Sequence, residues 1–258
     1  MSFLKRLLGL RGEREEERPF VDRSPRIQLL PLHDIRFELT SPEQVSTIQI
    51  ANVSSSGIGF LRSSWNDWPA PASTLEGWVQ TLSEGHNERL DITVRIARIS
   101  TSVVGCSLLE PLLAWGSLVS RYFDQELAAV TMIAVDPAKL QAESDGQPHW
   151  LNGAHNTDLY FVTRPGDPNH IVRFNLTFLG NYVEGGNALP TKYGKVEEAP
   201  LRETPTYKAS SLIRWNVSPD YQLVASATRF VRSIPHLSFD QKEEFARLLE
   251  KERAVPAP

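Results

Sequence analysis

A short polar motif, Asn52-x-Ser54-x-x-Gly57, stands at the end of one alternating stretch and opens the next. The Asn amide and the Ser hydroxyl offer hydrogen-bond donors and acceptors at a strand end. Glycine allows either a positive φ or the close approach of a ligand to the backbone. This set favours recognition of a polar ligand. The same pattern is also typical of an ordinary turn in a β protein, so both interpretations stay open.

Arginines gather upstream of this motif, at Arg18, Arg23 and Arg26. Guanidinium groups bind phosphate in a bidentate way and stack on purine faces. Residues 1–26 hold seven Lys and Arg against five Asp and Glu, hence +2, whereas the rest holds 20 against 26, hence −6. The net charge of −4 excludes a whole-chain basic footprint for DNA or RNA. It does not exclude one small anionic ligand beside the arginines.

Other candidate sites do not support catalysis or metal binding. His149 and His155 match no common ligand spacing, and we predict that they are polar turn residues. Cys106, the only cysteine, excludes an intramolecular disulfide and a multi-cysteine zinc site, and we expect it to be a small buried hydrophobe. No GxSxG or HExxH motif occurs. We therefore predict no enzyme, no catalytic residue, no cofactor and no metal.

The elements that must position the polar motif are strands. Apolar and polar residues alternate over 35–39, 46–54 and 90–99, which is the period of half-buried strands. Turn signals between these runs favour a small antiparallel barrel or sandwich. Trp65, Trp68 and Trp78 lie in and after a Pro-rich loop. We expect them to close one end of the barrel, with an exposed recognition surface as the alternative.

The rest of the chain divides into a helix and a second β-rich half. Residues 109–130 have helical spacing and predict a connecting helix. Strand-like runs follow at 158–163, 170–183, 210–217 and 221–233, and a capping box at Ser238 and Gln241 begins a terminal helix. The fold class is mainly β. The predicted domains are an N-terminal segment over 1–19, a barrel over 20–112, a connecting helix over 113–130 and a β-rich domain of unrecognised type over 131–258.

The first residues and the composition bear on localisation. Phe3, Leu4 and Leu7 lie at helical spacing beside Lys5 and Arg6, which indicates either a frayed terminal helix or a weak basic anchor for a membrane surface or partner groove. No secretory signal and no membrane-spanning run occurs. With 41% hydrophobic and 22% charged residues, the chain is expected to be a cytoplasmic globular protein.

The segment IQIANVSSSGIGF resembles the (D/N)xSxxG signature of the PilZ family, and RLDITVRIARISTSVVGCSLLEP resembles the later strands of PilZ barrels. The resemblance covers residues 20 to 112. It implies a six-stranded antiparallel barrel that binds cyclic di-GMP, with Asn52, Ser54 and Gly57 holding a guanine edge. In the family an RxxxR stretch before the first strand grips phosphates and bases. Here Asp22 stands where the first arginine belongs, and the resemblance leaves Arg23, Arg26 and Arg18 for that role.

Three functions follow for testing. The first is a bacterial cyclic di-GMP receptor that couples nucleotide binding to an unidentified protein partner in the control of motility, biofilm or surface behaviour. The second is a degenerate PilZ-like adaptor that binds protein without nucleotide. The third is an enzyme within residues 130–258. The resemblance favours the receptor.

Overall fold

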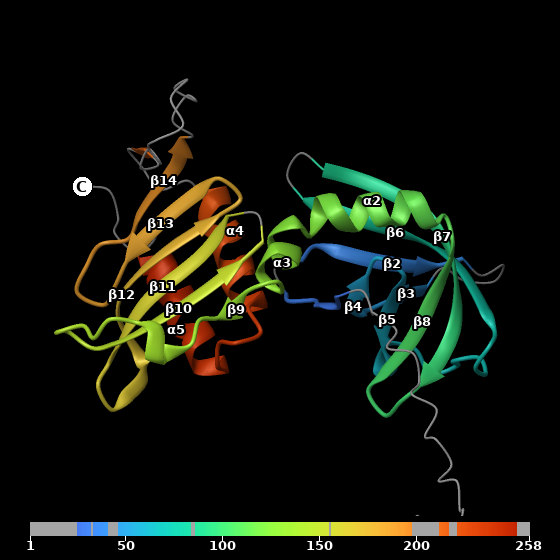
Figure 1. Cartoon of the computed structure of the whole chain (residues 1–258). Helices are drawn as coiled ribbons and strands as arrows, with labels where there is room; N and C mark the ends of the chain where they lie inside the picture. Colours follow the sequence, from blue (N-terminus) through green and yellow to red (C-terminus); the bar gives the residue numbers. More distant parts are fainter. Residues whose placement is uncertain are drawn as a thin grey trace, which may run out of the picture.

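The computed structural model describes residues 25–31, 33–40, 46–83, 86–154, 156–197, 212–216 and 221–251. These residues form two β-rich halves that lie side by side and are connected through two short helices (Figure 1). Each half has its own cluster of buried apolar side chains. The expected fold class, mainly β, is confirmed. Within the described residues, no helix is long and apolar enough to span a lipid bilayer.

The N-terminal half contains one antiparallel sheet of eight strands in the order β1-β4-β5-β8-β7-β6-β2-β3. A short 3-10 helix, η1 (Arg62–Ser64), follows β5. The strands are β1 (Ile27–Gln28), β2 (Ile35–Leu39), β3 (Ser46–Ile48), β4 (Ile50–Ser54), β5 (Gly57–Leu61), β6 (Thr74–Ser83), β7 (His86–Ile99) and β8 (Val103–Glu110).

This sheet curls on itself because one run of chain belongs to both of its ends. Strands β3 and β4 are separated only by Gln49, yet β3 pairs with β2 at one end while β4 pairs with β5 and β1 at the other. The resemblance implies six strands, and the sheet has eight. The number differs because the alternating run 46–54 is interrupted at Gln49 and because β1 adds a short edge strand.

The core of this half fills the inside of the curl. Val53, Ile58, Phe60 and Val104 are all buried there, as the period of two predicts. Their neighbours in sequence therefore face outwards, and these include the polar motif. Trp65 and Trp68 are half-buried, and the Trp68 ring lies 5.8 Å from that of Phe60. These two rings pack against the core, as expected for residues that close a barrel end. Trp78 differs from that expectation: it lies within β6, and the Arg89 guanidinium is 4.4 Å from its ring centroid.

Two helices connect the halves, α2 (Leu112–Tyr122) and α3 (Asp124–Ala129). The sequence predicts one helix here, but it is interrupted at Phe123, where φ is −117° and ψ is 29°. The Phe123 ring is fully buried in the N-terminal core, whereas Ala128 and Ala129 belong to the C-terminal core. The break therefore lets the connection pack into both cores.

The C-terminal half contains a seven-stranded antiparallel sheet, in the order β15-β14-β13-β12-β11-β10-β9, and two helices that pack together against one of its faces (Figure 1). Its elements are β9 (Ile133–Ala134), η2 (Pro137–Lys139), β10 (Gln147–Gly153), β11 (Thr157–Arg164), β12 (Asp167–Phe178), β13 (Asn181–Gly185), β14 (Lys192–Glu197), β15 (Leu212–Trp215), α4 (Tyr221–Ser233) and α5 (Phe239–Glu250).

Helix α4 corrects the sequence prediction, because residues 221–233 were expected to form a strand. The buried positions recur every three or four residues, which is helical spacing; they are Leu223, Val224, Ala227, Thr228, Phe230 and Val231. β-Branched and aromatic residues favour strands locally, but burying this stripe against the sheet determines the outcome. The C-terminal half therefore ends in two helices and not in one.

Helix α5 begins with the predicted capping box: the Ser238 hydroxyl accepts from the Gln241 backbone N–H, and the Gln241 side chain accepts from the Ser238 backbone N–H. Its Phe245 ring packs edge-on against Phe161 of β11 and Phe174 of β12. The capped start and the aromatic contacts hold α5 against the sheet.

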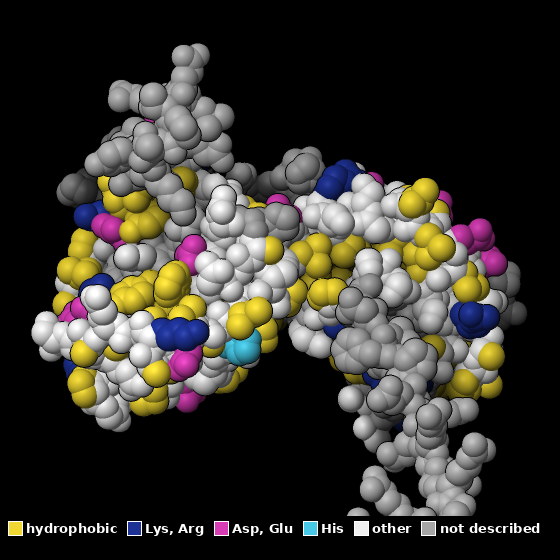
Figure 2. All heavy atoms as spheres, in the orientation of Figure 1, with side chains coloured by type: hydrophobic (Ala, Val, Ile, Leu, Met, Phe, Trp, Pro, Cys, Tyr) yellow, Lys and Arg dark blue, Asp and Glu magenta, His cyan; other side chains and the backbone are white. Residues whose placement is uncertain are grey.

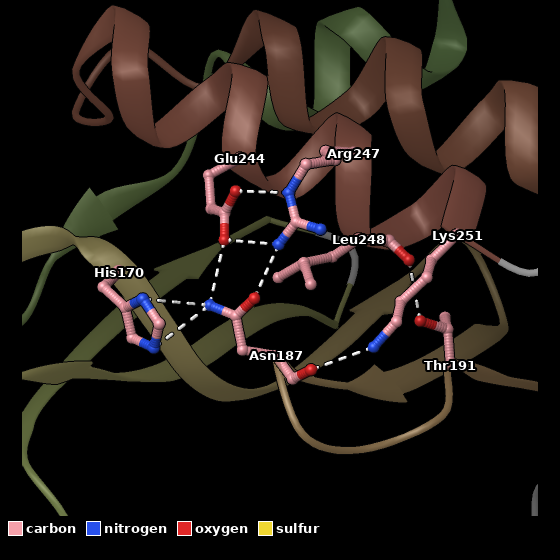
Figure 3. Close-up of polar contacts among 7 residues, drawn as sticks. All are labelled: His170, Asn187, Thr191, Glu244, Arg247, Leu248 and Lys251. Atoms are coloured by element: carbon pink, nitrogen blue, oxygen red, sulfur yellow. Dashed lines mark hydrogen bonds and ion pairs between the residues drawn. The ribbon is translucent and has the colours of Figure 1, made fainter.

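A polar cluster fixes the loop after β13 to α5 (Figure 3). The Asn187 amide group donates to Glu244 Oε1 at 3.0 Å and accepts from Arg247 Nη2 at 2.6 Å. Lys251 Nζ donates to the Asn187 carbonyl, and Thr191 Oγ1 donates to the Leu248 carbonyl at the end of the helix. These hydrogen bonds connect the loop to the helix, so we interpret the cluster as a structural contact that stabilises their packing.

Candidate functional site

Four of the six predicted site residues lie together on the outside of the N-terminal sheet. Arg26, Asn52, Ser54 and Gly57 line one hollow of about 240 Å³. The other two, Arg18 and Arg23, lie outside the described residues. The hollow is also lined by Ser56, Ile58, Ala97, Arg98, Val103, Gly105, Cys106 and Ser107.

Arg26 reaches the hollow because the edge strand β1 pairs with β4. Ile27 lies opposite Val53 and Gln28 opposite Asn52, and the Leu29 N–H donates to the Ala51 carbonyl at 2.9 Å. The Ile27 side chain is buried, whereas Arg26 is exposed immediately before the strand. The two-residue strand thus places one guanidinium beside the polar motif.

The motif itself forms the tight connection between β4 and β5. Ser54 lies opposite Gly57, and its hydroxyl donates to the Gly57 carbonyl at 3.4 Å. A Cβ atom on Gly57 would lie 2.5 Å from the carbonyl oxygen of Cys106. Glycine is therefore needed for close packing against β8. Positive φ is not its role, since the only described glycines with positive φ are Gly166 and Gly180.

Two glycines of the outer face lie beneath longer side chains of the neighbouring strands. Asn52, Gly59, Gly105 and Arg98 lie opposite one another in register across β4, β5, β8 and β7. A Cβ on Gly59 would lie 2.7 Å from Asn52 Oδ1, and one on Gly105 would lie 3.3 Å from Arg98 Cγ. The Asn and Arg side chains therefore extend over the two glycines from opposite sides. We call this row of four residues the glycine trough.

A β-bulge brings Arg98 to this outer face. The pairing of β7 with β8 shifts between Ile96 and Arg98, so that Ile96 lies opposite Cys106 while Arg98 lies opposite Gly105. Without the shift, Arg98 would follow the inward series of Ile92, Val94 and Ile96. Alternation alone therefore does not predict an outward Arg98. The available signal was that the next large apolar residue after Ile96 is Ile99, which breaks the period of two.

The electrostatics of the hollow are set by unpaired arginines. Arg26 and Arg98 are exposed, as is Arg95, which lies opposite Ser107 on the same face. Within the part of the chain that the structure describes, none of these three guanidinium groups has a carboxylate within ion-pair distance. An anion brought to the trough would meet these guanidinium groups without competition from an acid among the residues that the structure describes.

The remaining chemical groups near the hollow do not suit catalysis. Burial raises the pKa of the Cys106 thiol to about 12, so that it stays protonated and is a poor nucleophile. An Asn amide, a Ser hydroxyl and guanidinium groups without a carboxylate partner among the described residues can bind a flat anionic ligand by packing, hydrogen bonding and charge.

The histidine pair differs from its prediction in part. His149 lies in strand β10 and not in a turn; its ring stacks on Phe161 at 4.6 Å and its Nε2 is 3.0 Å from Thr163 Oγ1. Burial lowers the pKa of His149. His155 lies outside the described residues. No group of three or more His, Cys, Asp or Glu side chains suited to a metal occurs among the residues with described positions.

Comparison with known proteins gives matches to solved structures alone. No family model and no curated protein sequence matches the chain. An uncharacterised Legionella protein is 15% identical and covers 39% of this chain and 96% of its own, with a TM-score of 0.30. The PilZ domain of CeSA from a cellulose-synthesizing bacterium is 19% identical, with coverages of 40% and 99% and a TM-score of 0.29. The Borreliella burgdorferi PlzA protein, solved in complex with c-di-GMP, is 11% identical, with coverages of 68% and 83% and a TM-score of 0.28.

Proposed function

We propose that the N-terminal half is a PilZ-like barrel that binds cyclic di-GMP in the glycine trough. The observation that carries this proposal is the convergence of Arg26, Asn52, Ser54 and Gly57 on one hollow. Arg26 stands immediately before β1, whereas residues 52–57 belong to β4, β5 and their connection, so the site joins segments that are distant in sequence. The proposed barrel contains β2 and β5 to β8, with β3 and β4 as one bent strand.

The purine part of the ligand has a place over Asn52 and Arg98. Because these side chains extend across Gly59 and Gly105, a flat base would contact the Asn52 amide and the Arg98 guanidinium. The Asn52 amide can donate to and accept from a guanine edge, and the Arg98 guanidinium can stack on the purine face. This assignment gives Arg98 a part of the role that the resemblance gives to the N-terminal arginines.

The phosphates have a place beside Arg26, with Arg18 and Arg23 proposed to join it. A guanidinium can hold two phosphate oxygens at once, and charge-assisted hydrogen bonds are about twice as strong as neutral ones. Asp22, which replaces the first arginine of the PilZ pattern, weakens this side of the site. Arg98 offsets that loss from the opposite side of the trough.

The output of the receptor is proposed to be an interaction of the whole chain with a protein partner, in control of motility, biofilm or surface behaviour. Nucleotide binding would order the arginine-bearing N-terminal segment on the barrel and change how the barrel meets the second half or the partner. Such an order–disorder change is an established way of converting ligand binding into a signal.

Isothermal titration of the full chain with cyclic di-GMP tests the binding. We expect a saturable heat at micromolar ligand that Arg26→Ala and Ser54→Ala both diminish. If tens of micromolar ligand give no heat and no shift in melting temperature, the receptor function is refuted. The alternative would then be the adaptor that binds protein without nucleotide. If binding occurs and neither variant changes the affinity, the ligand binds elsewhere.

A further inference from the structure

The candidate site is connected to the C-terminal half through a buried polar cluster that we call the joint: His33, Glu126 and Arg229. His33 follows β1, Glu126 lies on α3 and Arg229 lies on α4. The His33 and Glu126 side chains are fully buried, and that of Arg229 is 16% exposed. The joint therefore links three segments that are far apart in the sequence.

The side chains of the joint are connected by hydrogen bonds that meet at the Glu126 carboxylate. The His33 Nε2 is 2.6 Å from Glu126 Oε1, and Arg229 forms a fork on the same carboxylate, with Nε at 2.6 Å from Oε1 and Nη2 at 2.9 Å from Oε2. Arg229 Nη2 also donates to the Tyr122 carbonyl at the end of α2. Burial alone would raise the pKa of Glu126, but the hydrogen bonds from His33 and Arg229 outweigh it and hold this pKa below its ordinary value.

His33 connects the joint to the chain segment that follows β1, next to the candidate site. Its Nδ1 accepts from the Leu30 backbone N–H at 2.8 Å, which leaves Nε2 to donate to Glu126. The His33 backbone N–H donates in turn to the Leu30 carbonyl. The imidazole thus fixes the turn that immediately follows β1, and β1 begins next to Arg26.

Strand β1 needs such an anchor because it is short and lies at the edge of its sheet. It has two residues and pairs with β4 alone. A second contact holds β4, the strand that pairs with β1: the Trp115 indole of α2 donates to the Ser54 carbonyl at 2.8 Å. The strands on the Arg26 side of the hollow are therefore connected to the two helices that lead into the C-terminal half.

We propose that the C-terminal half, acting through Arg229, Glu126 and His33, positions the strand that presents Arg26 and so sets the affinity of the barrel for cyclic di-GMP. This inference rests on the proposed function and adds to it the residues that carry the coupling. Because coupling free energies are reciprocal, occupation of the trough also strengthens the contact between the two halves.

Two arginines on α4 make a matched test. Arg229→Met removes the fork on Glu126, whereas Arg232→Met removes an ion pair with Glu243 of α5 that stays inside the C-terminal half. By titration of the full chain, we expect Arg229→Met to weaken binding of cyclic di-GMP by about fivefold and Arg232→Met to leave it unchanged. Equal affinities in both variants would overturn the inference, whereas absence of binding by the unaltered chain would refute the proposed function.

Backbone hydrogen exchange supplies a readout that a general loss of stability does not reproduce. In Arg229→Met without ligand, we expect faster exchange at Leu30 and His33 and unchanged exchange in β5 and β8. Uniformly faster exchange over the N-terminal sheet would contradict a positioning role. If Arg229→Met does not fold, Arg229→Lys keeps the charge with a single donor group, and it is expected to show the same local pattern with a smaller change in affinity.

Discussion

The two halves of the molecule each turn one face of a sheet to solvent, and these faces differ in what covers them. On the N-terminal sheet, the Asn52 and Arg98 side chains extend over two glycines, and the nearby arginines have no acidic partner among the described residues. On the C-terminal sheet, large side chains fill the face away from α4 and α5. Figure 2 shows hydrophobic side chains gathered on the visible side of that half, with charged groups beside them.

The polar groups of the C-terminal face interact with one another. Arg173 lies 2.9 Å from Glu143 and 3.0 Å from Asp145, and Lys192 lies 3.4 Å from Glu184. The Trp150 indole donates to Asp158 at 2.8 Å. The charges of the C-terminal face thus pair with one another, whereas Arg26, Arg95 and Arg98 of the N-terminal face have no acidic partner among the described residues. This difference is the one that the proposed function requires between a structural surface and a binding surface.

The largest expected effect on ligand binding comes from a side chain that fills the trough. Gly105→Val suits a strand, but its side chain occupies the floor and displaces Arg98. We expect the affinity for cyclic di-GMP to fall about 100-fold, with the fold retained. The measurement is calorimetry combined with circular dichroism. Thr177→Val, which places the same side chain on a half-buried position of the C-terminal sheet, should bind like the unaltered chain.

Removing a single cation from each face gives the next largest effect. Arg98→Met should weaken binding about tenfold, because a charged hydrogen-bond donor or stacking group is lost. Arg173→Met should leave binding unchanged and lower the melting temperature slightly, since that guanidinium is engaged by Glu143 and Asp145. Both affinities are measured by titration. Equal losses of affinity in the two variants would show that ion pairing of the arginines does not distinguish the two faces.

Removing the Ser54 hydroxyl should have a smaller effect. Ser54→Ala loses a neutral group, and we expect binding to weaken about fivefold in the same titration. Ser56→Ala is the comparison within the same connection: Ser56 also lines the hollow, and its backbone carbonyl, which accepts from the Leu108 N–H, is unchanged in this variant. We expect a smaller loss than in Ser54→Ala. A larger loss of affinity in Ser56→Ala than in Ser54→Ala would mean that the ligand binds closer to Ser56 than to Ser54.

The smallest expected effect concerns Cys106, which lies beneath the trough. Burial raises the pKa of its thiol to about 12, whereas an unfolded cysteine ionises near pH 8.5, at about its ordinary pKa. The stability associated with the neutral thiol is thus fully present below about pH 8.5 and is lost as the pH rises towards the folded pKa. We therefore expect the free energy of unfolding, measured with urea between pH 7 and pH 10, to fall more steeply with pH for the unaltered chain than for Cys106→Ala. Parallel pH profiles would contradict this account.

The sequence predicted the local features well and the long-range ones poorly. Alternation of apolar residues located β2, β4 and β7, and the Ser238–Gln241 pair located the start of α5, because these signals depend on near neighbours. Helix α4 was missed because its composition favours a strand, and only packing against the sheet reveals its apolar stripe.

The candidate site shows the same limit. The resemblance supplied Arg26, Asn52, Ser54 and Gly57, and these residues meet in the structure. It did not supply Arg98, because a bulge in β7 reverses the direction that simple alternation assigns to it. Gly59 and Gly105 gain meaning only from the register of β5 with β8, which no single stretch of sequence encodes.

Amide hydrogen exchange of the full chain with and without cyclic di-GMP tests the binding surface directly, since it reports on both sheet faces at once. We predict slower exchange in residues 26–29, 52–59 and 98–107, and no change in β12, β13 and β14. Protection confined to the C-terminal sheet, or no protection at saturating ligand, would contradict the assignment of the glycine trough as the nucleotide site.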